Sequence, residues 1–198
     1  MELIVLATRS RGKAAEFQRL LAGIAGRFET LLDHPGLALP PEGAGSYREN
    51  ALAKARAVCA ALGVPALGDD SGLEVDALGG VPGVRSARFA GEGASEGDNN
   101  ARLLAALAAI PPLRRTARFR CVLALVREPG DEIVVEGICE GRILEGPRGA
   151  YGFGYDPLFV PEGEAKSFAE LQAERKDRLS HRGRATASLL VALKISHS

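Results

Sequence analysis

Two adjacent acidic residues, Asp69 and Asp70, stand between an apolar segment and Ser71, and a glycine-rich stretch earlier in the chain carries Glu42. Mg²⁺ prefers carboxylate oxygens and usually completes its shell with water and substrate phosphates. Adjacent carboxylates also push one another's pKa values apart, which favours a metal-binding or a basic role for one of them. We therefore expect a short strand that runs into an acidic turn, where Glu42, Asp69 and Asp70 are candidate ligands of Mg²⁺. The alternative is that one aspartate only caps a turn or a helix.

A second polar cluster follows an apolar run at residues 3–7. It consists of Thr8, Arg9, Ser10, Arg11, Gly12 and Lys13. Backbone N–H groups at the start of a helix bind phosphate oxygens, and hydroxyl groups and a lysine ammonium strengthen such a site. The spacing is not that of a Walker A loop, in which the glycines lie further apart. The cluster predicts phosphate binding, and the alternative is a capped helix with a solvated lysine.

The segment at residues 152–157 places aromatic side chains beside a carboxylate and two glycines. It contains Phe153, Gly154, Tyr155 and Asp156. Glycine allows a backbone to approach a flat ligand closely, and aromatic faces pack against such a ligand. We expect this segment to contact a flat ligand, and the alternative is a loop whose aromatic rings fill the protein core.

A fourth group of polar residues precedes or begins the last predicted helix. Lys176, His181 and Arg182 provide an ammonium, an imidazole and a guanidinium, which bind phosphate groups and the edge of a base. As isolated residues they are more often part of a solvated surface. Taken together, however, the four groups offer carboxylates for a cation, cations for phosphates and aromatic rings for a base. This combination indicates a nucleotide-binding site.

The arrangement of strands and helices that must hold these residues is typical of an α/β fold. The apolar run at residues 3–7 predicts a buried strand, followed by a polar loop and a helix. Residues 117–126 and 132–144 predict two further strands. The turn-forming residues 127–131 between them predict a hairpin, so the sheet must be mixed.

Two helices are strongly indicated in the middle of the chain. The stretch from Ser46 to Gly63 has apolar residues at helical spacing, and Ser46 with Glu49 matches a capping box. A second helical pattern covers residues 99–110. Residues 167–196 predict two more helices, which complete the α/β pattern.

The composition is that of an ordinary globular protein. There are 25 basic and 25 acidic residues and 5% aromatic residues, which does not favour nucleic-acid binding. The N-terminal residues do not resemble a signal peptide, and no apolar run approaches the roughly 18 residues needed to cross a bilayer. Cys59, Cys121 and Cys139 lack metal-ligand spacing, so we expect buried free thiols in a reducing cytoplasm.

Four stretches of the sequence match the motifs of a known family. They are SYRENALAKARA from residue 46, PALGDDSGLEVDALGGVPGVRSARFAG from residue 65, GFGYDPLFV from residue 152 and SHRGRA from residue 180. Together they resemble the inosine/xanthosine triphosphate pyrophosphatase family (Ham1-like), from residue 3 to near residue 193. The resemblance implies a Mg²⁺-dependent hydrolase that converts ITP, dITP and XTP to the monophosphate and pyrophosphate. The implied fold is a single domain over residues 1–198, with a long mixed sheet flanked by helices and two lobes with the nucleotide in the cleft between them. A homodimer is also implied.

The resemblance further assigns roles to individual residues. Thr8 to Lys13 would bind the triphosphate, Glu42 and Asp70 would bind the metal, and Asp70 would also accept a proton. The chemistry of the residues alone leaves open whether Asp69 or Asp70 takes that proton. The other implied substrate-binding residues are Ser71, Phe153, Gly154, Tyr155, Asp156, Lys176, His181 and Arg182.

The sequence departs from the family pattern at one position and leaves two other functions to consider. The first motif of the family usually has Asn where this chain has Ser10, so substrate affinity is expected to differ.

One rival function is that of a Maf-like pyrophosphatase for modified nucleotides, against which the SHRG and GFGYDP stretches argue. The other is a purine nucleotide sensor without hydrolytic activity, against which the retained acidic residues argue.

Overall fold

The computed structural model of the chain describes residues 1–41, 43 and 45–195. The chain forms two compact units. Unit 1 comprises residues 1–70, 121–137 and the chain from residue 182 onward, and unit 2 comprises residues 71–120 and 138–181. The predicted metal ligand Glu42 lies outside the described residues.

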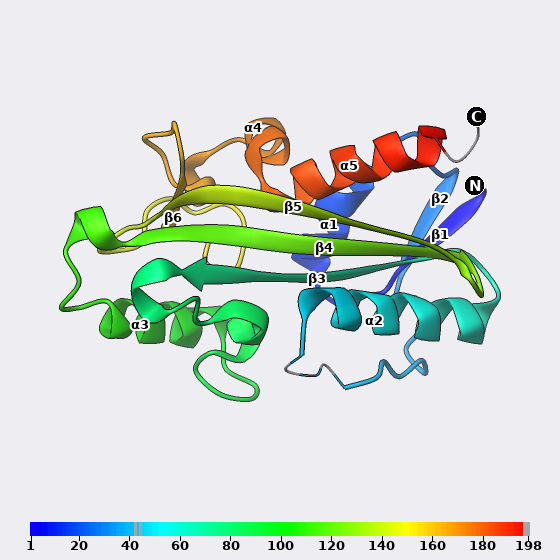
Figure 1. Cartoon of the computed structure of the whole chain (residues 1–198), viewed down its shortest axis with the longest axis horizontal. Helices are drawn as coiled ribbons and strands as arrows, with labels where there is room; N and C mark the ends of the chain where they lie inside the picture. Colours follow the sequence, from blue (N-terminus) through cyan, green and yellow to red (C-terminus); the bar gives the residue numbers. More distant parts are fainter. Residues whose placement is uncertain (42, 44, 196–198) are drawn as a thin grey trace. The chain divides into compact units, whose positions relative to one another are not determined.

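The strands form one mixed sheet in the order β2-β1-β3-β4-β5-β6 (Figure 1). Their bounds are β1 Leu3–Leu6, β2 Arg27–Thr30, β3 Ala66–Val75, β4 Thr116–Glu128, β5 Asp131–Ile143 and β6 Phe159–Pro161. β1 pairs in parallel with β2 and β3, whereas β5 pairs antiparallel with β6. Only residues 129 and 130 join β4 to β5, and so short a connection produces a hairpin. The predicted α/β fold with a mixed sheet is therefore confirmed.

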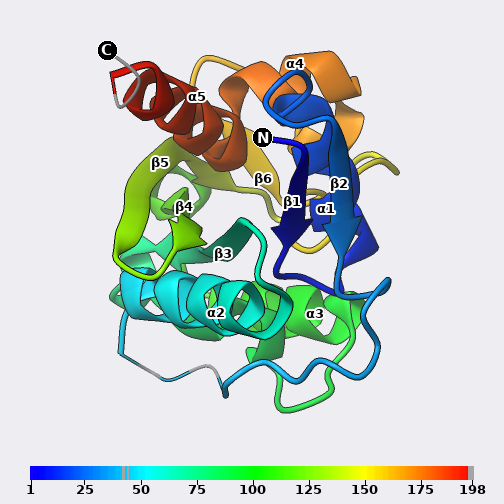
Figure 2. The same ribbon diagram turned by 90° about the vertical axis from the view of Figure 1, so that its right-hand side faces the viewer.

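In unit 1, helices cover both faces of the strands. The helices α1 (Arg11–Leu20) and α5 (His181–Ile195) lie on one side, and α2 (Tyr47–Leu62) lies on the other (Figure 2). The core under α1 and α5 is formed by Ile4, Leu6, Phe17, Leu21, Leu67, Cys121, Leu123, Leu125, Ala185, Leu189 and Leu193. This core joins the first strand of the chain to its last helix.

Helix α2 is in direct backbone contact with β3. Side chains alternate along a strand, so Leu67 faces the core under α1 and α5 while Gly68 faces α2. A Cβ atom at Gly68 would overlap the carbonyl oxygen of Ala51 and would lie 3.0 Å from the backbone nitrogen of Ala55. Only glycine permits this approach, which brings the polar residues of α2 to the strand.

The ends of α2 agree with the prediction. Ser46 Oγ accepts a hydrogen bond from the N–H of Glu49 at 3.1 Å, and the helix ends at Leu62, before Gly63. Helix α3 (Glu96–Ala106) begins earlier than the predicted residue 99, because Ser95 and Asp98 form a capping box. The sequence pattern located this helix but missed its first turn and extended it to residue 110, whereas the helix ends at Ala106.

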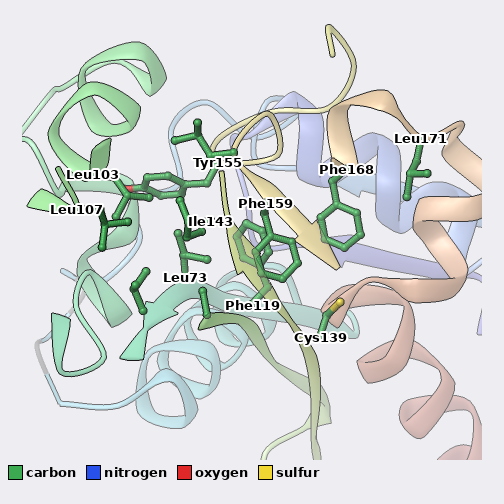
Figure 3. Close-up of a cluster of buried hydrophobic side chains, with 13 residues drawn as sticks. Leu73, Leu103, Leu107, Phe119, Cys139, Ile143, Tyr155, Phe159, Phe168 and Leu171 are labelled. Atoms are coloured by element: carbon green, nitrogen blue, oxygen red, sulfur yellow. The ribbon is translucent and has the colours of Figure 1, made fainter. Parts of the chain in front are cut away.

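Unit 2 contains α3, α4 (Ala173–Leu179) and short 3₁₀ helices. Its core, part of which is shown in Figure 3, is formed by Leu73, Val75, Leu103, Leu107, Ala117, Phe119, Cys139, Ile143, Tyr155, Leu158, Phe159, Phe168 and Leu171. The Phe119 ring packs against Phe159 and Phe168, with centroids 4.7 and 6.0 Å away. These aromatic contacts connect β4 to the segments that follow β5.

The predicted acidic turn at Asp69 and Asp70 is wrong. Both residues lie inside β3, which continues to Val75. A strand tolerates two buried carboxylates here because cationic and amide groups from distant segments surround them, as described below. The prediction of buried free thiols is confirmed for Cys59, Cys121 and Cys139.

Within the described part of the chain, none of the helices is both long enough and apolar enough to span a bilayer.

Candidate active site

The segment from Thr8 to Lys13 connects β1 to α1 and shapes the start of that helix. Ser10 is the N-cap of α1, and its Oγ accepts a hydrogen bond from the N–H of Lys13 at 3.3 Å. The N–H of Ser10 in turn donates to Thr8 Oγ1 at 3.1 Å. The helix is therefore capped, as the alternative interpretation of this segment expected, yet Lys13 is not merely solvated, because it reaches an acidic side chain.

Arg9, Arg11 and Gly12 have different environments within this segment. The Arg9 guanidinium donates to the carbonyl oxygens of Leu31 at 3.2 Å and Leu37 at 2.7 Å. It thereby ties the loop after β2 to the start of α1. Arg11 is exposed and Gly12 is half-buried in the first turn of α1.

Asp69 is surrounded by cationic groups and a thiol, all within unit 1. Its Oδ2 lies 2.5 Å from Lys13 Nζ, and its Oδ1 lies 3.9 Å from Arg182 Nε. Cys121 Sγ donates to Oδ1 at 3.2 Å. Burial, followed by the nearby Asp69 carboxylate, raises the pKa of the Cys121 thiol well above its ordinary value of 9.0, so the thiol keeps its proton.

Asp70 has different partners, which come from α2. Asn50 Nδ2 donates to Asp70 Oδ2 at 2.8 Å, and Lys54 Nζ lies 3.6 Å from Asp70 Oδ1. Lys54 also donates to the carbonyl oxygen of Asp69 at 3.0 Å. Ser71, the next residue of β3, is half-buried. The Asp70 carboxylate thus contacts residues of α2, whereas the Asp69 carboxylate contacts Lys13, Cys121 and Arg182.

Arg182 completes this arrangement from α5. Its Nη1 lies 2.9 Å from Glu16 Oε2 of α1, and both side chains are buried. The resulting set of three acidic and three basic side chains, called the charge cluster below, consists of Glu16, Asp69, Asp70, Lys13, Lys54 and Arg182. Buried charges persist in a folded protein only when such partners compensate them.

In unit 2, the segment at residues 152–157 is held by an ion pair with α4. Lys176 Nζ lies 2.5 Å from Asp156 Oδ2, which also accepts from the N–H of Phe153 at 2.8 Å. The Lys176 ammonium lies over the Phe153 ring, 4.9 Å from its centroid. Gly152 has a φ of +75°, and a Cβ atom there would overlap the Asp156 carboxylate, so this position requires glycine.

Neighbouring residues of the same segment have structural contacts. Tyr155 lies in the core of unit 2 near Leu103 and Leu107 (Figure 3), and its hydroxyl donates to the carbonyl oxygen of Ser86 at 2.8 Å. The carbonyl oxygen of Gly154 accepts from Asn100 Nδ2 at 3.0 Å. For Tyr155, the structure therefore matches the alternative of an aromatic ring that fills the core.

His181 also lies in an apolar environment. Its ring is 2% exposed and stacks on Phe119, with centroids 4.6 Å apart and an interplanar angle of 10°. His181 and Arg182 are adjacent in sequence, but their side chains have separate surroundings, because Arg182 contacts Glu16 and Asp69. A shared role at one edge of a base, as expected from the sequence, does not follow from these contacts.

The structure adds functional candidates that the sequence analysis missed. These residues are Glu16, Asn50, Lys54 and Cys121, all within unit 1. Asn50 and Lys54 lie four residues apart on α2, and polar residues at this spacing on the otherwise apolar, buried face of the helix were the available signal. Among the described residues, no group of three or more His, Cys, Asp or Glu side chains forms a metal centre by itself.

Comparisons with known proteins identify the family of the chain. The Ham1 family model matches residues 4–192. A dITP/XTP pyrophosphatase of Geobacter sulfurreducens is 47% identical over 189 residues, which cover 96% of this chain and 95% of the relative. A second dITP/XTP pyrophosphatase, from Methylococcus capsulatus, is 49% identical over 195 residues, with 96% of each chain covered.

Solved structures give the same result. A HAM1 protein from Coxiella burnetii has a TM-score of 0.86 and 38% identity, with 98% of this chain and 99% of that chain covered. The Ham1 protein of Staphylococcus aureus has a TM-score of 0.84 and 34% identity over the full length of both chains. With the family model, the relatives and the fold in agreement, the chain belongs to the Ham1 family.

Proposed function

We propose that this chain hydrolyses dITP, ITP and XTP to the nucleoside monophosphate and pyrophosphate. Relatives that match nearly its whole length are named dITP/XTP pyrophosphatases. The observation that carries the proposal is the charge cluster, in which Asp69 lies beside Lys13 of α1 and Asp70 lies beside Lys54 of α2. A nucleoside triphosphate is a polyanion, and its hydrolysis requires both a proton acceptor and cations that stabilise the leaving pyrophosphate.

The phosphate end of the nucleotide is assigned to unit 1. Lys13, Lys54 and the N–H groups at the start of α1 bind the phosphate oxygens. Arg182 is assigned to this end as well, because it contacts Glu16 and approaches Asp69. It anchors the charge cluster rather than reading the base.

Mg²⁺ is the proposed cofactor. The Asp70 carboxylate is a hard oxygen ligand of the kind this ion prefers, and the lack of a larger ligand cluster among the described residues suits an ion completed by water and phosphate oxygens. Asp70 and Glu42 would hold the ion, which supplies charge neutralisation at the phosphates when bound.

Asp70 is the proposed proton acceptor. Water attacks the α-phosphorus, the bond from that phosphorus to its bridging oxygen breaks, and the proton from water passes to Asp70 while pyrophosphate leaves. Asp69 fits this role less well, because its two carboxylate oxygens face Lys13 and Cys121. Those contacts support a different role for Asp69, which is to hold Lys13 in place for phosphate binding.

The nucleoside end is assigned to unit 2. The segment from Phe153 to Asp156 and Lys176 provide an aromatic face and a fixed ion pair. Hypoxanthine and xanthine carry a 6-keto acceptor where adenine carries an amino donor. A protein donor such as His181 at that edge would meet another donor in ATP, and such mismatches discriminate strongly in buried sites.

A steady-state substrate panel tests the proposal. Pyrophosphate release with Mg²⁺ is expected to be at least about 100-fold faster from ITP, dITP and XTP than from ATP. Equal rates on all nucleotides would contradict the selectivity. Tight ITP binding without pyrophosphate release would instead identify a nucleotide sensor.

We further propose that the protein is a cytoplasmic homodimer. The family resemblance supports the dimer, and the three free cysteines suit a reducing compartment. Sedimentation analysis at micromolar concentration is expected to return twice the mass of the chain. A monomer under those conditions would contradict the assembly.

A further inference from the structure

The Asn50 side chain has three hydrogen bonds, which join two segments of unit 1. Its Oδ1 accepts from the N–H of Gly43 at 3.1 Å, and its Nδ2 donates to the carbonyl oxygen of Gly43 at 3.2 Å. The same Nδ2 donates to Asp70 Oδ2 at 2.8 Å. The residue is only 7% exposed. All of its carboxamide atoms are therefore engaged.

The bonds to Gly43 determine which end of the amide faces Asp70. An asparagine amide has a donor end and an acceptor end that differ little in shape. Because Oδ1 must accept from the N–H of Gly43, the NH₂ group is left to face the Asp70 carboxylate. The opposite orientation would place an amide oxygen against a carboxylate oxygen, which is repulsive.

The contact of α2 with β3 holds Asn50 at this distance. Ala51, the next residue of α2, meets the backbone of Gly68, two residues before Asp70. The helix therefore cannot move away from the strand without losing that close packing. With the helix placed in this way, the hydrogen bond from Asn50 Nδ2 to Asp70 Oδ2 limits rotation of the Asp70 carboxyl group about its Cβ–Cγ bond.

We propose that Asn50 is a positioning residue that orients the Asp70 carboxylate for the metal before the nucleotide binds. The inference rests on the proposed function, since it assumes that Asp70 binds the metal. Groups that hydrogen-bond a metal ligand fix its orientation, and their loss typically weakens metal affinity or activity by about 10- to 100-fold. Asn50 does not touch the substrate and acts through Asp70.

The decisive experiment measures metal binding without nucleotide. Mn²⁺ binding to the full chain, followed by electron paramagnetic resonance, is compared for the native protein and Asn50→Ala. The dissociation constant is expected to rise by about 10-fold or more in the variant. Asn50→Gln retains the carboxamide and is expected to recover part of the affinity. It also serves as the test protein should Asn50→Ala fail to fold.

Val58→Ala is the matched control. Val58 is a fully buried residue of α2, two turns beyond Asn50, and its truncation weakens the same helix without touching Asp70. Mn²⁺ affinity is expected to be unchanged in this variant. If Val58→Ala and Asn50→Ala lose affinity equally, or if neither loses any, the positioning role is wrong.

The remaining outcomes separate this inference from the proposed function. The Mg²⁺ concentration for half-maximal pyrophosphate release is expected to rise in Asn50→Ala, with turnover largely restored at saturating Mg²⁺. Undetectable Mn²⁺ binding to the native protein would overturn the inference, because it requires a site prepared before the nucleotide arrives. Native protein that binds Mn²⁺ but releases no pyrophosphate from ITP or XTP would overturn the proposed function alone.

Discussion

The backbone of Gly68 on β3 lies directly against the carbonyl oxygen of Ala51 on α2. This contact determines how far the helix stands from the strand, and hence whether Asn50 and Lys54 reach Asp70. Gly68 immediately precedes the acidic pair in sequence. The glycine is therefore as much a part of the site as the carboxylates that follow it.

Gly68→Ala is expected to lower both stability and turnover. The added methyl group would overlap backbone atoms of α2, and overpacking of this kind costs about 1–3 kcal/mol of unfolding free energy. Urea unfolding and pyrophosphate release check the two effects. Gly36→Ala, also in unit 1 but with open space around the new Cβ atom, is expected to change neither.

Substitutions of Asp69 and Asp70 are expected to alter different kinetic parameters. Asp70→Asn is expected to reduce kcat by at least about 100-fold, because it removes the proposed proton acceptor. Asp69→Asn is expected mainly to raise KM, because Lys13 loses its carboxylate partner at 2.5 Å. Steady-state kinetics with ITP separates the two. Near-normal kcat in Asp70→Asn would remove that residue from its role.

Ser10, which stands where the family motif usually has Asn, caps α1. Ser10→Ala is expected to cost about 1 kcal/mol of unfolding free energy, the usual value of an N-cap hydrogen bond. Ser10→Asn is expected to retain stability, because asparagine caps helices equally well, and to lower KM for ITP through its additional amide donor. An unchanged KM would show that the family's Asn has no role in affinity.

Lys176 is expected to be important for the stability of unit 2. Lys176→Met would leave the buried Asp156 carboxylate without its cation, and breaking a buried pair in this way costs about 3–5 kcal/mol. Urea unfolding measures the loss. The exposed Lys166→Met serves as the control and is expected to unfold like the native protein. Equal stability of the two variants would contradict the importance of the pair.

Tyr155 is expected to resist ionisation at alkaline pH. Burial raises its pKa from the ordinary value of 10.0, so the folded state keeps a proton that the unfolded state loses. The unfolding free energy should therefore fall as the pH rises above 10.0. Absorbance at the tyrosinate band checks the assignment in the native state.

A Tyr155 variant provides the comparison. Tyr155→Phe is expected to leave the native tyrosinate signal near pH 10.0 unchanged, because the buried Tyr155 hydroxyl does not contribute to it. Loss of native signal in Tyr155→Phe would show that the buried hydroxyl titrates normally.

Much of the fold was predictable, because local patterns reflect local structure. The alternation in β4, the turn before β5 and the capping residue Ser46 each act over a few residues. The placement of Asp69 and Asp70 inside β3 was not predictable in this way. It depends on Lys13, Lys54 and Arg182, which come from three helices spread over the whole chain.

Contacts between distant segments also limited what could be predicted about the candidate site. The motif around Tyr155 predicts an aromatic side chain near a ligand, but whether the ring faces outward or fills the core depends on its distant partner Ser86. Asn50 lies within a recognised helix, and only the contact between Gly68 and Ala51 reveals that it reaches Asp70. Spacing along one segment contains no information about such contacts between segments.

The shared core of β1 and α5 has a consequence for synthesis on the ribosome. Ile4 and Leu6 leave the exit tunnel long before Leu189 and Leu193, so the core that they share stays incomplete until α5 has been made. The core of unit 2 runs from Leu73 to Leu171 in sequence, so all of it is translated before Leu189 and Leu193. Unit 2 is therefore expected to become protease-resistant first in arrested nascent chains, while the amino-terminal strand is still a target for chaperones.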